Sequence, residues 1–284
     1  MNSMRIIVIT GDGLEHRYVA NMLAAKVPLA GIVVDHGKPA RAIEKVRKYF
    51  RRYTTVQLMF RAGLAVLRRV WRDRANRREA VLSILGRESC LEFLHSELLQ
   101  HVRGINTPEG VRAVASLEPD VILVYGTGIV GKKVLSLARR LALNMHTGIS
   151  PYYRGCDCSF WPLYNEELHM LGATVHECIK EVDGGRIFGT TGIQLQAVDN
   201  LFAVAARCVE AGADLYVRKV QELMEHGLEG APQDLSSGME YKAIMRGARA
   251  EWKVRSSIRA GMILRYVQSH RETKSDSVPV PVGK

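Results

Sequence analysis

The chain lacks any run of about 18 uncharged apolar residues, so we expect no membrane-spanning helix. We also expect no secretory signal, because the first residues lead directly into the apolar, strand-like run at 6–9. Its five cysteines are odd in number and show none of the spacings of a disulfide framework. We therefore expect reduced thiols and a cytoplasmic protein.

The composition also lacks the extremes that mark disordered or fibrous chains. Hydrophobic residues make up 47% of the sequence and charged residues 24%, which is the ordinary globular range. A chain of 284 residues can bury a sizeable core. Its length fits two domains or one α/β domain that carries an insertion.

Acidic residues are nearly absent from one segment, residues 41–78. This segment has thirteen Lys or Arg but only two acids, Glu44 and Asp73, so it carries a charge equal to the +11 of the whole chain. Its apolar residues recur at helical spacing, which predicts one or two basic amphipathic helices. Three interpretations stay open: a packed surface insertion, a helix on an anionic membrane, and a nucleic-acid contact. Charge alone does not choose between the last two.

Strand and helix patterns alternate along the rest of the chain. Strands are expected at 5–10, 29–34, 121–126, 142–146, 173–179 and 186–195, and helices at 14–25, 132–141, 158–168, 200–227 and within 238–270. The alternation favours an α/β fold with a parallel sheet. The polar, proline-containing end of the chain, 271–284, is expected to be disordered.

The glycine pair at the first turn gives only a weak cofactor signal. Gly11 and Gly13, together with Asp35, match part of the pattern of a dinucleotide-binding site. His16, however, occupies the position where that pattern needs a third glycine. A tight β-α turn explains the pair equally well, so NAD or FAD is disfavoured.

Metal and serine chemistry are also disfavoured. Five potential ligands lie within 23 residues but without CxxC or HExxH spacing: Cys156, Cys158, His169, His176 and Cys178. Ser150 and Ser159 lie near His146 without a G-x-S-x-G elbow. We interpret these groups as structural.

Asn144 and His146 are two residues apart at the end of an expected strand, so they project to the same face. An amide and an imidazole there can direct two donors at one oxygen, as an oxyanion site requires. Asp183, followed by Gly184 and Gly185, lies on an expected tight loop and can hold or relay a proton. Taken alone, these residues fit structural roles equally well.

The arrangement as a whole resembles the formyltransferases that use 10-formyltetrahydrofolate. Six elements occur in the family's order: Asn144-Met145-His146, Ile149-Ser150-Pro151, Arg154-Gly155, Trp161, Gly172-Ala173-Thr174-Val175-His176 and Asp183-Gly184-Gly185-Arg186-Ile187. The resemblance covers roughly residues 4–39 and 104–195. It implies a Rossmann-like α/β fold with a mostly parallel sheet and helices on both faces, plus the basic helical insertion and a helical C-terminal extension.

The resemblance also implies roles for individual residues. Asn144 and His146 would stabilise the oxyanion, while Asp183 would position His146 and accept the proton of the attacking amine, without a metal. The formyl donor, 10-formyltetrahydrofolate, would lie near Tyr125, Gly126, Thr127, Gly128, Ile129, Val130, Lys180, Glu181 and Val182. A loop containing Ser150, Arg154, Gly155, Cys156 and Asp157 would face the acceptor. Cys156-Asp157-Cys158 departs from the family pattern there, which indicates an unusual acceptor.

We accordingly expect a catalytic core at 1–200 with an insertion at 40–103, a helical extension at 201–270 and a tail at 271–284. The favoured activity is formyl transfer to a primary amine, on a nucleotide-linked or lipid-linked amino sugar or a similar small amine. The alternatives are formyltetrahydrofolate hydrolysis, methionyl-tRNA formyltransferase-like activity and a non-catalytic membrane-surface protein. The expected partner is a small-molecule or phosphate-bearing amine acceptor, and contact of 41–78 with an anionic surface at the inner face of the membrane stays open. Nucleic acid is disfavoured, and a homodimer stays open.

Overall fold

A seven-stranded sheet forms the centre of the protein. The computed structural model describes residues 4–37 and 54–271. The strand order is β3-β2-β1-β4-β5-β7-β8. The first five strands in this order run parallel to one another, and β7 runs antiparallel to both of its neighbours, β5 and β8. The strands span β1 Ile6–Thr10, β2 Leu29–Asp35, β3 Leu99–Val102, β4 Val121–Tyr125, β5 Leu141–His146, β7 Gly172–Glu177 and β8 Ile187–Gly192. The expectation of a mostly parallel Rossmann-like sheet is confirmed.

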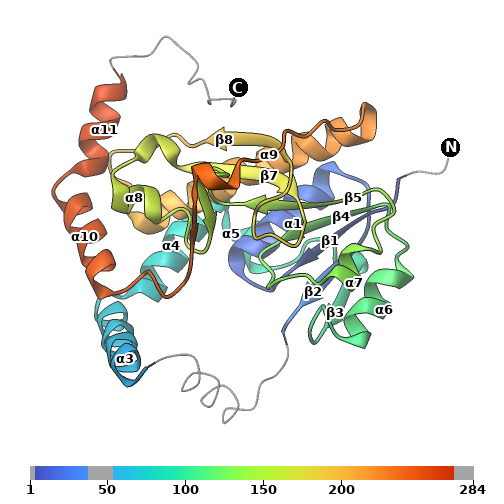
Figure 1. The fold of residues 1–284 in the computed structure, drawn as a ribbon, viewed down its shortest axis with the longest axis horizontal. Coiled ribbons are helices and arrows are strands. Elements are labelled where there is room, and N and C mark those ends of the chain that lie inside the picture. The colour runs from blue at the N-terminus through green and yellow to red at the C-terminus, as the bar shows by residue number, and fades with distance from the viewer. Residues whose placement is uncertain (1–3, 38–53, 272–284) are drawn as a thin grey trace.

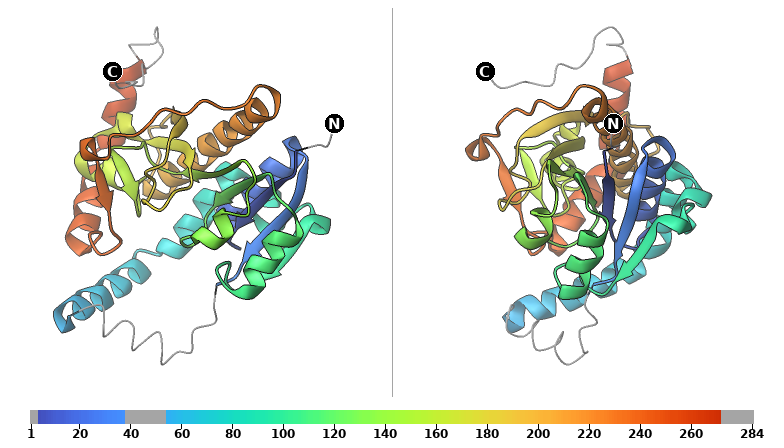
Figure 2. Two further views of the ribbon diagram at one scale, coloured as in Figure 1. Left: turned by 45° about the vertical axis from the view of Figure 1, so that its right-hand side comes forward. Right: turned by 90° about the vertical axis from the view of Figure 1, so that its right-hand side faces the viewer.

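Helices cover both faces of this sheet, as expected (Figures 1 and 2). One face packs against α1 (Leu14–Lys26), α4 (Asp73–Leu85), α5 (Arg87–Leu91) and α9 (Leu201–Glu225), and the other against α6 (Pro108–Ser116) and α7 (Lys132–Leu135). Strands β1 and β4 are buried along their whole length. Their continuous apolar runs are typical of parallel strands that are covered on both sides.

A second hydrophobic core joins the end of the chain to the sheet. It lies among α8 (Trp161–Asn165), the first turns of α9, α10 (Ala248–Arg259) and α11 (Met262–Arg271). Short strands β6 (Tyr153–Gly155) and β9 (Met239–Tyr241) pair in parallel beside it. The Trp161 and Tyr241 rings stack with their centroids 4.6 Å apart. The C-terminal extension therefore packs on the loop that follows β5.

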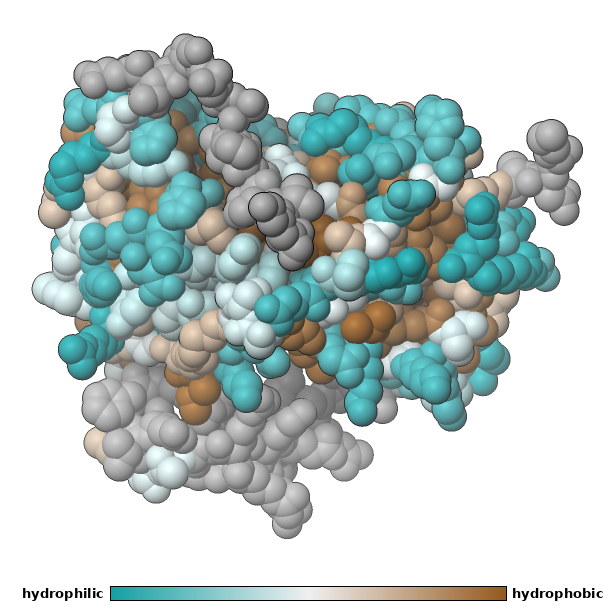
Figure 3. Space-filling model, turned by 45° about the horizontal axis from the view of Figure 1, so that its top comes forward, coloured by the Kyte–Doolittle hydropathy of each residue, from teal (hydrophilic) through white to brown (hydrophobic). Residues whose placement is uncertain are grey.

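The basic segment is helical where the structure describes it. Residues 41–53 lie outside the described residues, and α3 (Thr55–Val70) and α4 follow. Helix α4 buries Val81, Leu82 and Leu85 in the main core, whereas α3 projects from the body (Figures 1 and 2). No helix in the described part of the chain has the length and apolar character needed to cross a membrane. The space-filling view in Figure 3 shows hydrophilic side chains with hydrophobic areas between them.

Several element boundaries differ from the prediction. The expected helix at 132–141 stops after one turn, because the backbone N–H groups of Arg139 and Arg140 donate to the carbonyls of Pro119 and Asp120 instead of continuing the helix. The expected helix at 158–168 is only α8, which ends where Glu166 adopts a left-handed conformation with φ 61°. The edge strand β3 lies within 40–103, where the sequence indicated only helices. Residues 272–284, the expected tail, lie outside the described residues.

Candidate functional site

The carboxyl end of β5 carries two of the three expected catalytic residues. Asn144 lies opposite His176 of the antiparallel strand β7, and His146 lies opposite Thr174. Because alternate residues of a strand share one face, Asn144, His146 and His176 project toward the same region. The Asn144 amide nitrogen and His176 Nε2 lie 3.1 Å apart.

Asp183 completes this group from the loop between β7 and β8. Its backbone is left-handed with φ 49°, a strained conformation that is enriched at functional sites. One carboxylate oxygen, Oδ2, lies 3.3 Å from His146 Nδ1 and accepts the Gly155 N–H at 2.8 Å. The other, Oδ1, lies 3.3 Å from His176 Nε2. All three expected catalytic residues therefore meet, together with His176.

The partners of the two imidazoles determine where their protons lie. His146 Nε2 lies 2.9 Å from the Tyr153 carbonyl, and His176 Nδ1 lies 2.9 Å from the Glu177 carbonyl. A carbonyl oxygen only accepts, so each of these nitrogens donates. In the neutral rings, the nitrogens that face Asp183 are then unprotonated. The site thus offers two positions where one added proton would be held between an imidazole and the carboxylate.

Burial and charge set the resting state of this cluster. Burial lowers the pKa of His146 below its ordinary value of 6.5, and it outweighs the opposing effects of Asp183 and of the Tyr153 carbonyl. Burial alone would raise the pKa of Asp183, but the two imidazoles, when each carries a proton toward the carboxylate, and the Gly155 N–H favour the carboxylate and lower that pKa to about 2. At neutral pH Asp183 is therefore ionised and His146 is neutral, which leaves the cluster able to accept a proton.

The loop expected to face an acceptor mainly supports this cluster. Arg154 is buried and donates to the carbonyls of Pro151, Val182 and Leu235. It therefore links the loop after β5, the Asp183 loop and the C-terminal extension. Ser150 is buried and precedes a cis proline, whereas Cys156 is exposed. Asp157 pairs with Arg246 at 2.7 Å.

The residues expected to contact the formyl donor lie on two loops with exposed surface. Tyr125 is buried at the end of β4, and the turn after it is left-handed at Gly126, with φ 68°. Asn106 holds this turn by bonding the Ile129 carbonyl and the Gly131 N–H. Ile129 is 83% exposed, and Val182 on the second loop is 39% exposed. The remaining expected residues follow in these loops: Thr127, Gly128 and Val130, and Lys180 and Glu181.

His16 explains the glycine pair at the first turn. Its Nδ1 accepts the Gly13 N–H at 3.1 Å, at the start of α1. A Cβ on Gly11 or on Gly126 would lie within 2.6 Å or 2.3 Å of the His16 ring. The glycines thus leave room for a buried imidazole, whose pKa burial lowers. This ring occupies the end of α1 that a dinucleotide phosphate would approach.

Other features of the described residues do not form a competing site. No group of three or more His, Cys, Asp or Glu side chains among the described residues is arranged so that it could hold a metal ion. Two open surface pockets lie elsewhere, one along α4 and one between the start of α9 and α10. Neither is lined by Asn144, His146 or Asp183.

Sequence reasoning did not assign catalytic roles to His176, to the Tyr153 carbonyl or to the Gly155 N–H. The only signal for His176 was its place in the Gly172–His176 strand motif. The two backbone groups carry no sequence signal, since any residue supplies them.

Comparisons with known proteins concern the family and the fold of the chain. The family model described as "Formyl transferase" matches residues 74–220, just over half of the chain. A sugar N-formyltransferase from a Shewanella species has a similar fold, with a TM-score of 0.51 at 13% identity over 84% of this chain and 76% of that chain. A 4-N formyltransferase from Francisella tularensis has a TM-score of 0.50 at 16% identity over the same shares, 84% and 76%. The chain therefore belongs to the formyl transferase family and is a formyl-transferring enzyme.

Proposed function

We propose that this enzyme transfers the formyl group of 10-formyltetrahydrofolate to the primary amine of an amino sugar. The observation that carries the proposal is the cluster of Asn144, His146, His176 and Asp183, with its open proton positions. Nucleophilic attack by an amine requires a group that takes up its proton and a donor that stabilises the charge on the formyl oxygen. The cluster contains both kinds of group.

Asn144 is the proposed donor to the formyl oxygen. One N–H of its amide is directed at His176 Nε2, and the other forms no hydrogen bond with a described residue. Asn144 is only partly buried, so this second N–H can meet a substrate. As the amine nitrogen bonds to the formyl carbon, one carbonyl electron pair moves to the oxygen. The amide then stabilises the negative charge that develops there.

His146 and Asp183 form the proposed proton acceptor. The amine loses its proton to the position between His146 Nδ1 and Asp183 Oδ2, where both groups hold it. When the bond from carbon to N10 breaks, N10 keeps the electron pair and receives a proton from the same position. The cluster is thereby restored, and neither a metal nor a covalent enzyme intermediate takes part.

The donor-facing loops support this choice of formyl donor. Ile129 and Val182 present exposed aliphatic surface on the two loops, which suits the flat face of a pterin. Lys180, Glu181 and Val182 are exposed residues, so the backbone N–H groups of this segment can donate to acceptor atoms of the ring. Sugar amines as acceptors are in keeping with the sugar N-formyltransferase described above, whose fold is similar. A nucleotide or lipid phosphate on the acceptor suits a chain of net charge +11.

The test is release of tetrahydrofolate from 10-formyltetrahydrofolate, measured with and without a pool of amino-sugar nucleotides. We expect release only when the pool is present. Asn144→Ala should lower the rate by about 10²- to 10³-fold, the usual cost of losing one oxyanion donor. Release without any acceptor would overturn transfer in favour of hydrolysis. Calorimetry on Asn144→Ala with the folate alone shows whether binding survives, and circular dichroism shows whether the fold does.

A further inference from the structure

We propose that the edge of the molecule formed by α3, α10 and α11 binds the surface of an anionic lipid bilayer. The three helices lie along one side of the molecule, and α3 projects beyond it (Figures 1 and 2). This membrane edge is defined by the exposed apolar residues Met59, Val66, Val70 and Trp252 and by the exposed arginines Arg69 and Arg259. The inference concerns association and does not depend on the proposed formyl acceptor.

The first observation is an exposed apolar stripe on α3. Met59, Val66 and Val70 are 71%, 62% and 71% exposed. Their spacings of seven and four residues put them on one side of the helix, and the exposed Gly63 lies between them. Leu64, on the opposite side, is buried. The helix therefore packs on one side and presents an apolar stripe on the other, as helices at a membrane interface do.

The second observation is the distribution of charge. Residues 54–72 contain no Asp or Glu, and residues 242–271 contain only Glu251. Glu251 has no exposed side-chain surface, and it binds Arg68, Arg246 and Arg255. Both segments therefore present arginine and lysine to solvent without any acid. Such a surface is attracted to anionic headgroups.

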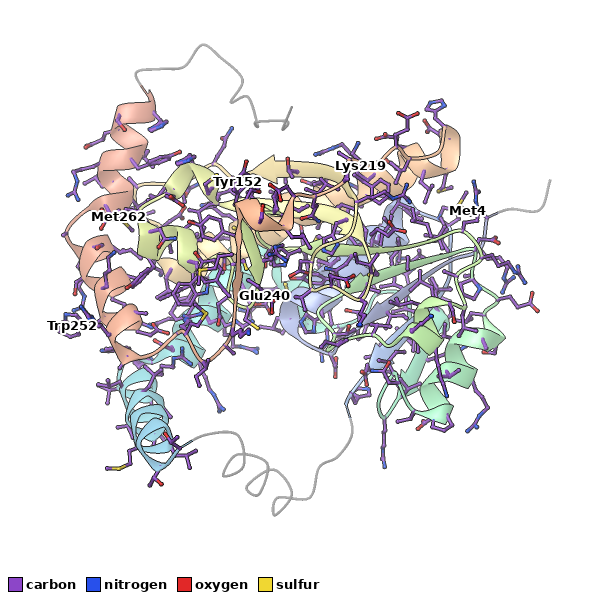
Figure 4. The ribbon with its side chains drawn as sticks, in the orientation of Figure 1. Met4, Tyr152, Lys219, Glu240, Trp252 and Met262 are labelled. Atoms are coloured by element: carbon purple, nitrogen blue, oxygen red, sulfur yellow. The ribbon has the colours of Figure 1, made fainter. Side chains whose placement is uncertain are left out.

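The third observation is the link between two distant segments of the chain. Glu251 of α10 pairs with Arg68 of α3 at 2.6 Å. Arg255 of α10 pairs with Asp73 at 2.7 Å and lies over the Trp71 ring at 4.3 Å. These contacts fix α3 against α10. The adjacent Trp252 is 62% exposed and points outward from α10 (Figure 4). An aromatic ring with a polar N–H is favoured at the level of the headgroups.

The combination of an exposed apolar stripe with exposed basic residues favours a bilayer over a nucleic acid as the partner of this edge. Phosphodiester backbones are bound by basic and polar side chains, and bases by stacking on aromatic rings. An aliphatic stripe of valine and methionine provides neither. Buried in a bilayer interface, the same stripe adds apolar contact to the electrostatic attraction.

The test is flotation of the full-length protein with vesicles of phosphatidylcholine alone or mixed with phosphatidylglycerol. We expect binding to the mixed vesicles that weakens as salt is raised, and little binding to phosphatidylcholine alone. Arg69→Glu should weaken binding about 10-fold or more. The matched control Arg218→Glu makes the same charge change at an exposed position on α9 and should leave binding nearly unchanged.

A second pair of variants tests the apolar stripe. The double variant Met59→Gln, Val70→Gln should weaken binding by about 10-fold. The control Leu94→Gln, Met224→Gln changes two exposed apolar residues outside the edge and should not weaken it. All these positions are exposed, and circular dichroism checks that each variant folds.

Four results would overturn the proposal. The first is absence of flotation with either vesicle, and the second is equal flotation of all variants. The third is a protein that does not bind vesicles but sediments as a dimer, and whose dimer dissociates in the double variant Met59→Gln, Val70→Gln. That result would show that the edge binds a second copy of the chain. Binding to RNA without binding to vesicles would overturn it in favour of a nucleic-acid surface.

Discussion

At the scale of single residues, Asp183 determines the chemistry of the site. Its carboxylate lies 3.3 Å from His146 Nδ1 and 3.3 Å from His176 Nε2. The same residue type on an exposed loop would be an ordinary acid. Here burial, a strained backbone and two imidazoles make it part of a proton acceptor. Its loop position and its pairing with His146 were expected from the sequence and the family resemblance. The second imidazole was not.

The pH dependence of the rate tests the pairing of His146 with Asp183. Because the pKa of His146 is lowered, kcat/KM should stay constant as pH falls to about 6.5 and decline only below it. Asp183 raises the pKa of His146, so Asp183→Asn should move this acid limb to lower pH. The variant should also lower kcat by roughly 10²- to 10⁴-fold, the range for loss of acid–base catalysis. Steady-state kinetics from pH 5 to pH 8 measures both effects. An acid limb that moves upward in Asp183→Asn would contradict the assignment.

We propose that His176 is a positioning residue that acts through Asn144. Its Nε2 accepts one N–H of the amide, which sets the direction of the other. His176→Ala should therefore lower kcat by roughly 10- to 100-fold, the usual effect of misplacing a reacting group. His176→Gln offers a carbonyl oxygen as an alternative acceptor and should restore part of the rate. Steady-state kinetics measures kcat and KM separately, and we expect KM to change little. A variant that raises KM alone would place His176 in substrate binding instead.

At the scale of elements, a buried ion-pair network joins the basic segment to the C-terminal extension. Glu251 is fully buried and holds three arginines, and two of these also pair with Asp157 and Asp73. Burial disfavours the Glu251 carboxylate, but the surrounding arginines outweigh this and lower its pKa. The network connects α3, α4 and α10 with the loop after β6.

Glu251→Ala should destabilise the protein by about 3–5 kcal/mol, because it leaves three arginines without their shared partner. Urea unfolding followed by circular dichroism measures this change. Glu229→Ala removes an exposed glutamate and should change the free energy of unfolding by less than about 0.5 kcal/mol. A similar loss in both variants would show that Glu251 has no special structural role.

The strands and helices with strong periodic patterns could be predicted from the sequence, and those fixed by tertiary contacts could not. The buried runs of β1 and β4 and the long α9 follow directly from apolar patterning. The end of α7 depends on carbonyls of Pro119 and Asp120, which lie far from it in sequence. Strand β3 is short and mostly polar, so it becomes a strand only beside β2.

The candidate site likewise has some contacts that could be predicted from the sequence and others that could not. Asn144 and His146 share a strand, so their proximity follows from the alternation of side chains. The contact with His176 depends on the register of β5 against β7, which sequence spacing does not determine. Tyr153 and Gly155 contribute backbone groups whose roles depend entirely on the path of the loop.

At the scale of the whole molecule, the catalytic cluster and the membrane edge are built on different parts of one fold. The cluster lies at the carboxyl end of the sheet, where α/β proteins bind ligands. The edge lies on the α3, α10 and α11 side (Figure 1). Arg154 and the network around Glu251 connect the loop after β5 with the C-terminal extension. An acceptor held at an anionic surface would therefore meet an enzyme that binds the same surface.

The most direct test of the central claim follows the formyl carbon itself. The protein is incubated with a ¹³C-formyl donor and a pool of amino-sugar nucleotides, and the products are analysed by mass spectrometry. We predict an amino sugar whose mass rises by one labelled formyl group in place of a hydrogen, formed about 10²- to 10³-fold more slowly by Asn144→Ala. Label found only in free formate, at equal rates with and without the pool, would contradict the account.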